Sequence, residues 1–247
     1  MLYPAELRDR WTHLAMVRRG FEALAFTMLL AGVPRAEAAE HPCLWRPAKS
    51  VDGPIILAGV RTATGASVPY DVPDDARLHP TAKPDRYRRV PTFVSDAEGL
   101  AQERWLREGR ALARPSDEPA ACRKALLAAE AEARKARRGL WRTFRIDRAA
   151  DPTLAKRVQR FAIVEGRVRS VGDRTHALYL NFGANWSEDL TVFLRKRDLR
   201  RHADLLEILR GSEGRRVRVR GWLEARNGAF MRVRDAGQIE FLDGSGS

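Results

Sequence analysis

The sequence contains little that would mark a metal centre or a membrane span. Among its 247 residues there are only two cysteines, Cys43 and Cys122, and they lie far apart without a neighbouring pair of histidines. That spacing gives no zinc-binding signature. The main apolar run, residues 21–33, is shorter than the about 20 residues that a membrane-spanning helix needs. Lysine is also scarce, so arginine supplies most of the basic residues.

Positive charge is the strongest feature of the composition. Lysine and arginine together number 45 against 32 acidic residues, which gives a formal net charge of +13. A surface with this charge attracts phosphate backbones or anionic membranes through its long-range field. Arginine-rich sequences also arise in GC-rich genomes, so charge alone favours nucleic-acid binding only modestly.

The N-terminal 40 residues have the pattern of an address signal. After Met16 come two arginines, the apolar run of residues 21–33 broken by Glu22, and Ala36-Glu37-Ala38, which fits a cleavage site. We expect residues 16–38 to be an export signal within an extension spanning 1–40, with either Met1 or Met16 as the true start. The expected location is periplasmic or secreted, with cytoplasmic as the alternative. Membrane contact is expected only through an uncleaved signal segment.

An oxidising compartment would allow the two cysteines to pair. A disulfide between Cys43 and Cys122 would tie the mature N-terminus to the helix that contains Cys122. The alternative is two buried free thiols in a cytosolic protein.

The stretch from Ala120 to Trp141 has the spacing of an amphipathic helix. Small apolar residues recur three and four positions apart, which places them on one stripe. The stripe consists of Cys122, Leu126, Ala129, Ala133, Ala136 and Leu140. We expect a helix that docks closely on a sheet, capped by Ser116, Asp117 and Pro119, with its basic residues solvated. Glu130 would pair with Arg134 one turn later, and Gly139 would stop the helix.

Residues Asp85 to Trp141 resemble the second half of a staphylococcal-nuclease-like (thermonuclease) domain. The matching pieces are Asp-Arg-Tyr-Arg-Arg entering a strand that includes Phe93, a helix over Leu106–Ala113, and a closing helix that ends Arg-Arg-Gly-Leu-Trp. The resemblance implies a small barrel followed by a docking helix. It also implies phosphodiester cleavage, in which acids bind calcium and activate water while arginines stabilise phosphate charge.

The catalytic motifs of that family are missing. In one register Pro54 and Ile55 replace an acid and a threonine; in the other, Ile56, Arg61 and Thr64 replace the first arginine, an acid and the glutamate. Without those carboxylates, an arginine can bind phosphate but cannot generate a hydroxide nucleophile.

The resemblance leaves one matching catalytic position, Arg89, as a phosphate contact. Arg86 and Tyr87 match positions that flank the nucleotide, and Arg88 replaces the usual turn glycine. A relocated calcium site at Asp71, Asp74 and Asp75 is the alternative, although acids beside prolines more often form a solvated loop. We therefore expect no metal and no cofactor unless that calcium alternative holds.

The second half predicts another small barrel. Five strands are expected, and a helix over Lys196–Leu209 precedes the fourth, as in an OB-fold. The expected strands are Arg160–Val171, Ala177–Phe182, Leu190–Leu194, Val217–Leu223 and Ala229–Val233. Stretches such as Val164–Val168, Tyr179–Phe182 and Val217–Trp222 resemble nucleic-acid-binding OB domains of multidomain bacterial nucleases. The expected domains are 41–146 and 160–243, joined by a linker at 147–159.

Alternation along these strands predicts a nucleic-acid surface. Arg216, Arg218 and Arg220 fall on one face of a strand, and Arg167 and Arg169 repeat that pattern. With exposed aromatic residues they would form a groove on which single strands stack. The expected aromatics are Tyr179, Phe182 and Trp186. The alternative is that the aromatics belong to the core and the arginines form an ordinary hydrated face.

The sequence thus predicts a mainly β protein with helices (α+β), built from two small OB-like barrels, the first with a C-terminal docking helix. The expected function is binding of nucleic acid, preferably single-stranded, or another polyanion, with weak or absent phosphodiester hydrolysis. One alternative is an active calcium-dependent nuclease that uses Asp71, Asp74 and Asp75. Another is a structural or protein-interaction module of the cell envelope.

Overall fold

The computed structural model describes residues 41–44, 48, 50–116, 118–184, 189–200 and 202–244. The expected export signal at 16–38 therefore lies outside the described residues, as do Asp117 and Trp186. All described residues belong to one unit of the chain. No helix in those described ranges is long and apolar enough to cross a membrane.

The C-terminal half is a curled sheet in which β11 and β13 pair in parallel and the other barrel neighbours are antiparallel. The strand order is β8-β12-β13-β11-β10-β9, and the short strands β7 and β14 extend it. The bounds are Asp147–Arg148 (β7), Arg160–Arg167 (β8), Ser170–Arg174 (β9), Ala177–Asn181 (β10), Leu190–Arg195 (β11), Arg216–Ala225 (β12), Ala229–Val233 (β13) and Ile239–Phe241 (β14).

One bent segment of the chain forms both β8 and β9, which are the first and the last strand of this order. Only Val168 and Arg169 separate β8 from β9. Val168 donates its backbone N–H to Arg215 on one side, and Arg169 donates to Asn181 on the other. The segment therefore pairs with β12 and then with β10, which closes an OB-fold barrel. The strand expected over Arg160–Val171 is thus two strands, because the chain bends here to serve both neighbours.

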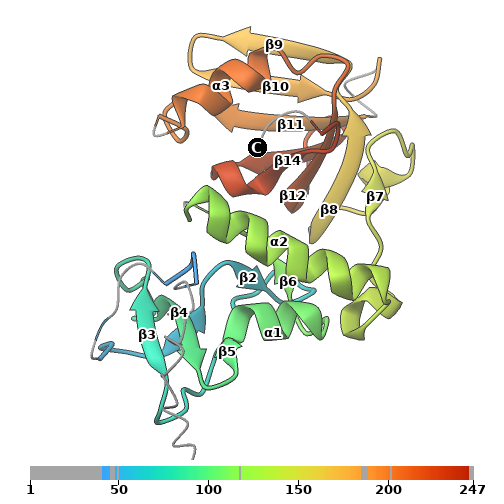
Figure 1. The fold of residues 1–247 in the computed structure, drawn as a ribbon. Helices are drawn as coiled ribbons and strands as arrows, with labels where there is room; N and C mark the ends of the chain where they lie inside the picture. The colour runs from blue at the N-terminus through green and yellow to red at the C-terminus, as the bar shows by residue number, and fades with distance from the viewer. Residues whose placement is uncertain are drawn as a thin grey trace, which may run out of the picture. The chain divides into compact units, whose positions relative to one another are not determined.

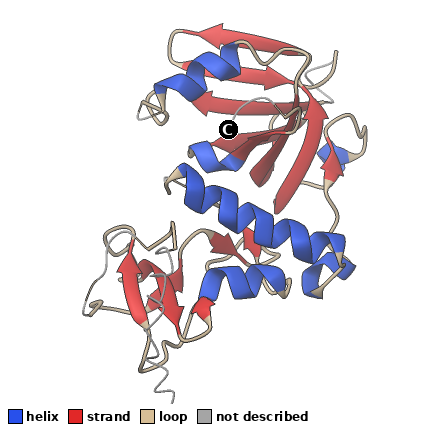
Figure 2. Cartoon of the chain, viewed as in Figure 1, coloured by secondary structure: helices blue, strands red, loops and turns tan. Residues whose placement is uncertain are grey.

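The helix α3 (Ala203–Arg210) lies between β11 and β12, as the sequence predicts, but it starts later than the expected Lys196. Along each strand the inward residues form one core that includes Leu178, Val192, Val219 and Met231. Figures 1 and 2 show the curled sheet with α3 beside it. The expected class, mainly β with helices, is confirmed.

In the first half the strands form two separate sheets. β4 (Val90–Asp96) lies between the parallel β1 (Ile55–Leu57) and the antiparallel β3 (Arg77–Pro80), and β5 pairs with its end. A two-stranded ribbon forms beside this sheet. The remaining bounds are Gly99–Leu100 (β5), Val60–Arg61 (β2) and Leu112–Ala113 (β6).

The helix that the family resemblance places over Leu106–Ala113 is shifted. α1 spans Ala101–Arg107, and the chain then turns at Gly109 into β6. Gly109 has φ 70°, and a Cβ there would lie 2.2 Å from the carbonyl oxygen of Arg138. Gly109 in turn accepts a hydrogen bond from Leu140. This close approach of two backbones ends α1 early.

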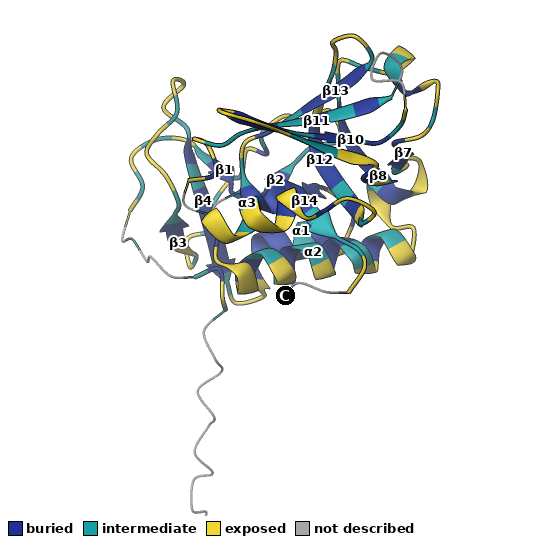
Figure 3. Ribbon diagram, turned by 90° about the horizontal axis from the view of Figure 1, so that it is seen from above, coloured by how far each residue is buried: buried dark blue, intermediate teal, exposed yellow. Residues whose placement is uncertain are grey.

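The long helix α2 spans Ala120–Lys135 and buries Cys122, Leu126, Ala129 and Ala133 of the apolar stripe that the sequence predicts. Ala136 and Leu140 follow the helix and are exposed and half-buried, respectively. Its ends differ from the prediction. Pro119 is the N-cap without a side-chain hydrogen bond, and the helix ends four residues before Gly139. Cys43 and Cys122 form the expected disulfide, with Cα atoms 4.8 Å apart. Figure 3 shows buried and exposed residues alternating along α2.

α2 joins the two halves. A shared apolar cluster contains Ala133, Trp141 and Leu112 from the first half with Phe161 and Ile163 from β8. The stretch 147–159, expected as a linker, also packs on the barrel. Asp147 is buried, and its carboxylate accepts from the guanidinium groups of Arg157 and Arg160.

Candidate nucleic-acid interface

Three aromatic rings lie side by side on the outer face of β10, β11 and β13. Tyr179 and Phe193 lie opposite each other on β10 and β11 and meet edge to face, with ring centroids 5.3 Å apart. Phe193 stacks on Phe230 at 5.7 Å, and Phe230 is itself buried, with 9% of the residue exposed. These three residues are called the stacking platform below. Their neighbours along each strand point into the barrel core, so alternation places the rings outward.

Two arginines on the platform have no carboxylate partner among the described residues. Arg232 lies opposite Phe193 with its guanidinium 5.5 Å from the ring centroid, and its Nε is buried without a hydrogen bond. Arg195 follows Phe193 two positions later on the same face. Unpaired guanidinium groups beside π-faces can bind a phosphate and stack on a base.

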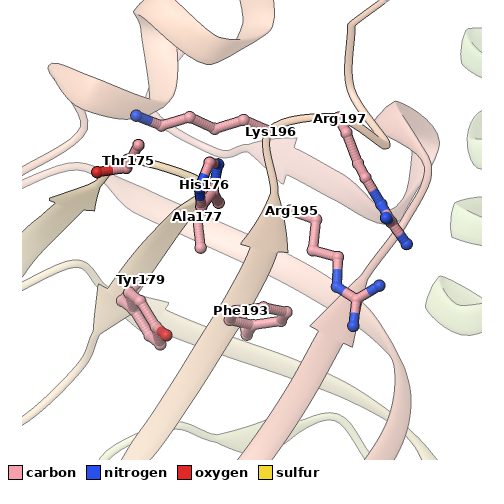
Figure 4. A pocket seen from close by; sticks show the side chains of 8 residues that line it. All are labelled: Thr175, His176, Ala177, Tyr179, Phe193, Arg195, Lys196 and Arg197. Atoms are coloured by element: carbon pink, nitrogen blue, oxygen red, sulfur yellow. The ribbon is translucent and has the colours of Figure 1, made fainter.

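A pocket of about 510 Å³ opens at the end of β10 and β11 beside Arg195 (Figure 4). Tyr179 and Phe193 line it from the strands, and the hairpin of Thr175 and His176 lines it from the loop before β10. The backbone N–H of Lys196 donates to the carbonyl of His176 at 3.0 Å, and this bond joins the end of β11 to the turn before β10. The Lys196 ammonium pairs with Asp173, and Nε of Arg197 lies 3.5 Å from Asp198. Arg195 therefore supplies the unpaired charge of the pocket's cationic edge among the described residues.

The strand that the sequence predicts as the binding surface is covered instead. Arg220 is fully buried under α2: its Nη1 donates to Glu130 at 3.0 Å and to the carbonyl of Ala113 at 2.6 Å, while Nη2 pairs with Glu240. Burial alone would lower the pKa of Arg220, but the two carboxylates outweigh it and raise the pKa. The prediction that Arg220 contacts nucleic acid is therefore wrong.

Its neighbours on β12 are also neutralised. Arg218 donates to Glu165 at 2.7 Å and to Glu240 at 3.2 Å, leaving 12% of its side chain exposed. Arg216 is exposed and lies 3.8 Å from Glu165. Arg134 of α2, expected to be solvated, is half-buried, and burial lowers its pKa, with Arg218 adding to the effect. Glu130 thus pairs with Arg220 of the barrel and not, as the sequence predicted, with Arg134 of its own helix.

The remaining predicted barrel residues are scattered. Arg167 and Arg169 are exposed near the bend between β8 and β9, where Arg167 donates to the carbonyl of Gly214. Tyr179 is part of the platform. Phe182 is 7% exposed and belongs to the barrel core, which corrects the expectation that it is exposed. Tyr179 and Phe182 are an odd number of positions apart, so a strand places them on opposite faces.

The turn before β4 contains Arg86, Tyr87 and Arg89, the residues expected to contact a nucleotide from the sequence resemblance. Arg89 donates from Nε and Nη2 to Asp85 at 2.9 and 2.7 Å, and this lowers the pKa of Asp85. Tyr87 is 59% exposed, with the guanidinium groups of Arg86 and Arg89 4.7 and 5.0 Å from its ring centroid. Arg88, at the usual glycine position, has φ 61°. Any phosphate at Arg89 would compete with Asp85.

The three carboxylates of the calcium alternative do not form a metal-binding cluster in the described part of the chain. Asp71, Asp74 and Asp75 are exposed in a loop, and no group of three or more potential metal ligands forms among the described residues. Arg61 lies at one of the expected acid positions. Burial, with Arg114 close by, lowers the pKa of Arg61 to about 10.

Sequence reasoning missed four residues of the interface, Phe193, Arg195, Phe230 and Arg232. The signal was present for the first two, because alternation along Leu-Thr-Val-Phe-Leu-Arg places Thr191, Phe193 and Arg195 on one face. What the sequence did not supply was the register that brings this strand beside Tyr179.

No protein-family model and no curated protein matches this chain. Among solved structures, part of the chain is similar to the S. pombe Stn1-Ten1 complex, with 15% identity over 34% of this chain and 58% of that one, at a TM-score of 0.27. It is also similar to OBody AM1L10 bound to hen egg-white lysozyme, with 20% identity over 37% of this chain and 85% of that one, again at 0.27.

A third similarity is to a Leishmania major Friedlin chain described as an aspartyl-tRNA synthetase, with 8% identity over 40% of this chain and 21% of that one, at a TM-score of 0.30. The match spans less than two thirds of this chain and of the Stn1-Ten1 chain. At such scores these similarities carry no weight, and the barrel is assigned from its strand order.

Proposed function

We propose that this protein binds single-stranded nucleic acid through the stacking platform and its unpaired arginines. The observation that carries the proposal is the pair of partly exposed rings, Tyr179 and Phe193, supported by the buried Phe230. These rings lie beside guanidinium groups without carboxylate partners among the described residues. Every base has a π-face, so such a platform binds single strands with little dependence on sequence. In OB-folds the second and third strands, here β10 and β11, are the ones that face oligonucleotides.

The test replaces a ring without changing the charge. Phe193→Leu should weaken binding of a single strand of about 12 nucleotides by about tenfold, since each stacked base contributes about 1–3 kcal/mol. The matched control is Trp222→Leu, because Trp222 is 44% exposed on β12 of the same barrel but outside the platform. Fluorescence anisotropy measures both affinities, and thermal unfolding checks both folds. Equal losses for the two variants would place the binding surface elsewhere.

We further propose that phosphodiester hydrolysis is weak or absent, as the degenerate resemblance to thermonucleases implies. The support is chemical: Pro54, Arg61 and Thr64 replace carboxylates, and hydrolysis needs a group that generates a nucleophile. Arg89, already bonded to Asp85, could still contact phosphate. Incubation of labelled DNA and RNA with calcium and then with chelator tests this. Calcium-dependent cleavage lost on Asp74→Asn would favour the nuclease alternative.

Export is proposed as well, from the pattern of residues 16–38. The Cys43–Cys122 disulfide is compatible with an oxidising compartment but does not indicate one by itself. Cell fractionation with N-terminal sequencing of the mature chain would test the cleavage after Ala38. An intact chain recovered from the cytoplasm would contradict it.

A further inference from the structure

A row of hydrogen-bonding side chains runs parallel to the stacking platform on the same face of the barrel. Ser170, Asn181 and Thr191 lie opposite one another on β9, β10 and β11. Asn181 Nδ2 donates to Ser170 Oγ at 3.2 Å, and Thr191 Oγ1 makes a long 3.5 Å bond to Asn181 Oδ1. These three residues are called the polar row below.

The order of groups along β10 and β11 matches the order of groups in a nucleotide. The cationic edge at Arg195 lies two residues beyond Phe193, and the polar row at Thr191 lies two residues before it. Each step of two residues spans about 6.7 Å along a strand. A phosphate at the cationic edge therefore leaves its base over the rings, because the sugar separates the two. The far edge of that base then points towards the polar row.

The polar row retains unused hydrogen-bonding capacity. A carboxamide has two N–H donors and an oxygen with two lone pairs, and Asn181 uses one of each within the row. One donor and one acceptor position therefore remain on this partly exposed residue. This pair is the arrangement that an asparagine uses for two simultaneous bonds to the edge of a base.

We propose that the polar row reads the hydrogen-bonding edge of a base stacked on the platform, so that the protein selects among bases. The inference rests on the proposed function, because it requires the base to lie on Tyr179 and Phe193. Asn181 is the residue that makes the edge contact, and Ser170 and Thr191 hold its carboxamide in place. The ligand class is therefore a single strand with a preferred base.

The test compares homopolymers of about 12 nucleotides, made of deoxyadenosine, deoxycytidine or thymidine, at one salt concentration. The wild-type protein should bind the best homopolymer about tenfold more tightly than the worst, as expected for a two-bond base contact. Asn181→Leu keeps the side-chain size but removes both groups. It should bring the three dissociation constants together while leaving the salt dependence of binding unchanged.

The control is Trp222→Leu, since Trp222 is exposed on β12 and lies outside the platform, the pocket and the polar row. This variant should keep the wild-type preference. Equal affinities of the wild-type protein for all three homopolymers would overturn the inference and leave the proposed function intact, and this outcome needs no variant that folds. A preference unchanged by Asn181→Leu would also overturn it. Failure of the wild-type protein to bind any homopolymer would reject the proposed function itself.

Discussion

Two sets of arginines lie on the outside of the same barrel, one on β12 and one on β11 and β13. On β12, Arg218 and Arg220 are each bonded to two carboxylates and lie under or beside α2. On the other face, Arg195 and Arg232 lie among aromatic rings, with no carboxylate partner in the ranges that the structure describes.

The difference follows from what covers each face. A helix that buries a guanidinium removes its water, and an unpaired buried charge costs several kcal/mol, so carboxylates must come with it. Glu130 of α2 and Glu240 of β14 meet that requirement. On the open face Arg195 and Arg232 are partly exposed, although Nε of Arg232 is buried, so contact with water lowers the cost of leaving them unpaired and they can bind phosphate. The exposure of the arginines, and not their number, distinguishes the ion pairs that hold α2 on the barrel from a surface that can bind a ligand.

The largest expected effect comes from breaking the buried ion pairs of Arg220 with Glu130 of α2 and Glu240 of β14. Arg220→Met leaves Glu130 buried without a cation, which should lower the free energy of unfolding by about 3–5 kcal/mol. Arg216→Met is the matched control on the same strand, because Arg216 is exposed and should cost about 0.5 kcal/mol or less. Urea denaturation measures both.

A further variant separates a lost pair from lost packing. Adding Glu130→Leu to Arg220→Met removes the orphaned carboxylate and should recover part of the loss. If Arg220→Met lowered the free energy of unfolding no more than Arg216→Met, the pair between Arg220 and Glu130 would not be what holds the two halves together.

A smaller effect separates the two sets by their salt dependence. Replacing Arg195 and Arg232 together with glutamine should lower the slope of log affinity against log salt by about 1.4, since single strands contribute about 0.7 per phosphate contact. Replacing Arg216 and Arg218 with glutamine should leave the slope unchanged, because carboxylates already neutralise Arg218. Titrations at several salt concentrations measure the slopes. An equal change in both pairs would mean that the two faces bind alike.

The smallest expected effect concerns two buried carboxylates. Burial raises the pKa of Glu118, which bonds to Ser116 without the guanidinium pair that Glu130 has. The folded state therefore holds this proton more tightly than the unfolded chain. Stability should fall as pH rises from the ordinary glutamate range through the raised pKa. Glu118→Gln should remove that fall.

The measurement is the urea midpoint between about pH 4 and pH 8. As a comparison, Glu130→Gln should destabilise the protein across this range, because it weakens the pair with Arg220 and the bond to the backbone of Ala113. A wild-type stability that rises steadily over the same window, unaltered by Glu118→Gln, would contradict the assignment to Glu118.

Local patterns in the sequence predicted most of the barrel but less of the first half. Alternation located the strands from Arg160 to Val233, and the Cys122 stripe predicted the buried face of α2. The helix expected over Leu106–Ala113 was misplaced, because its end depends on the contact between Gly109 and the backbone of Arg138, which is far away in the sequence. A family pattern carries no information about such a contact.

The sequence by itself determined the alternation of inward and outward side chains along most barrel strands, because strand geometry fixes a period of two, but it did not place Phe182 in the core. It placed Arg216, Arg218 and Arg220 outward together, and it placed Tyr179 outward as well. Only the tertiary structure decided which outward face α2 covers and which strand, through its register, brings Phe193 beside Tyr179. Coverage and register depend on contacts between distant segments, and a one-dimensional pattern of alternation does not encode them.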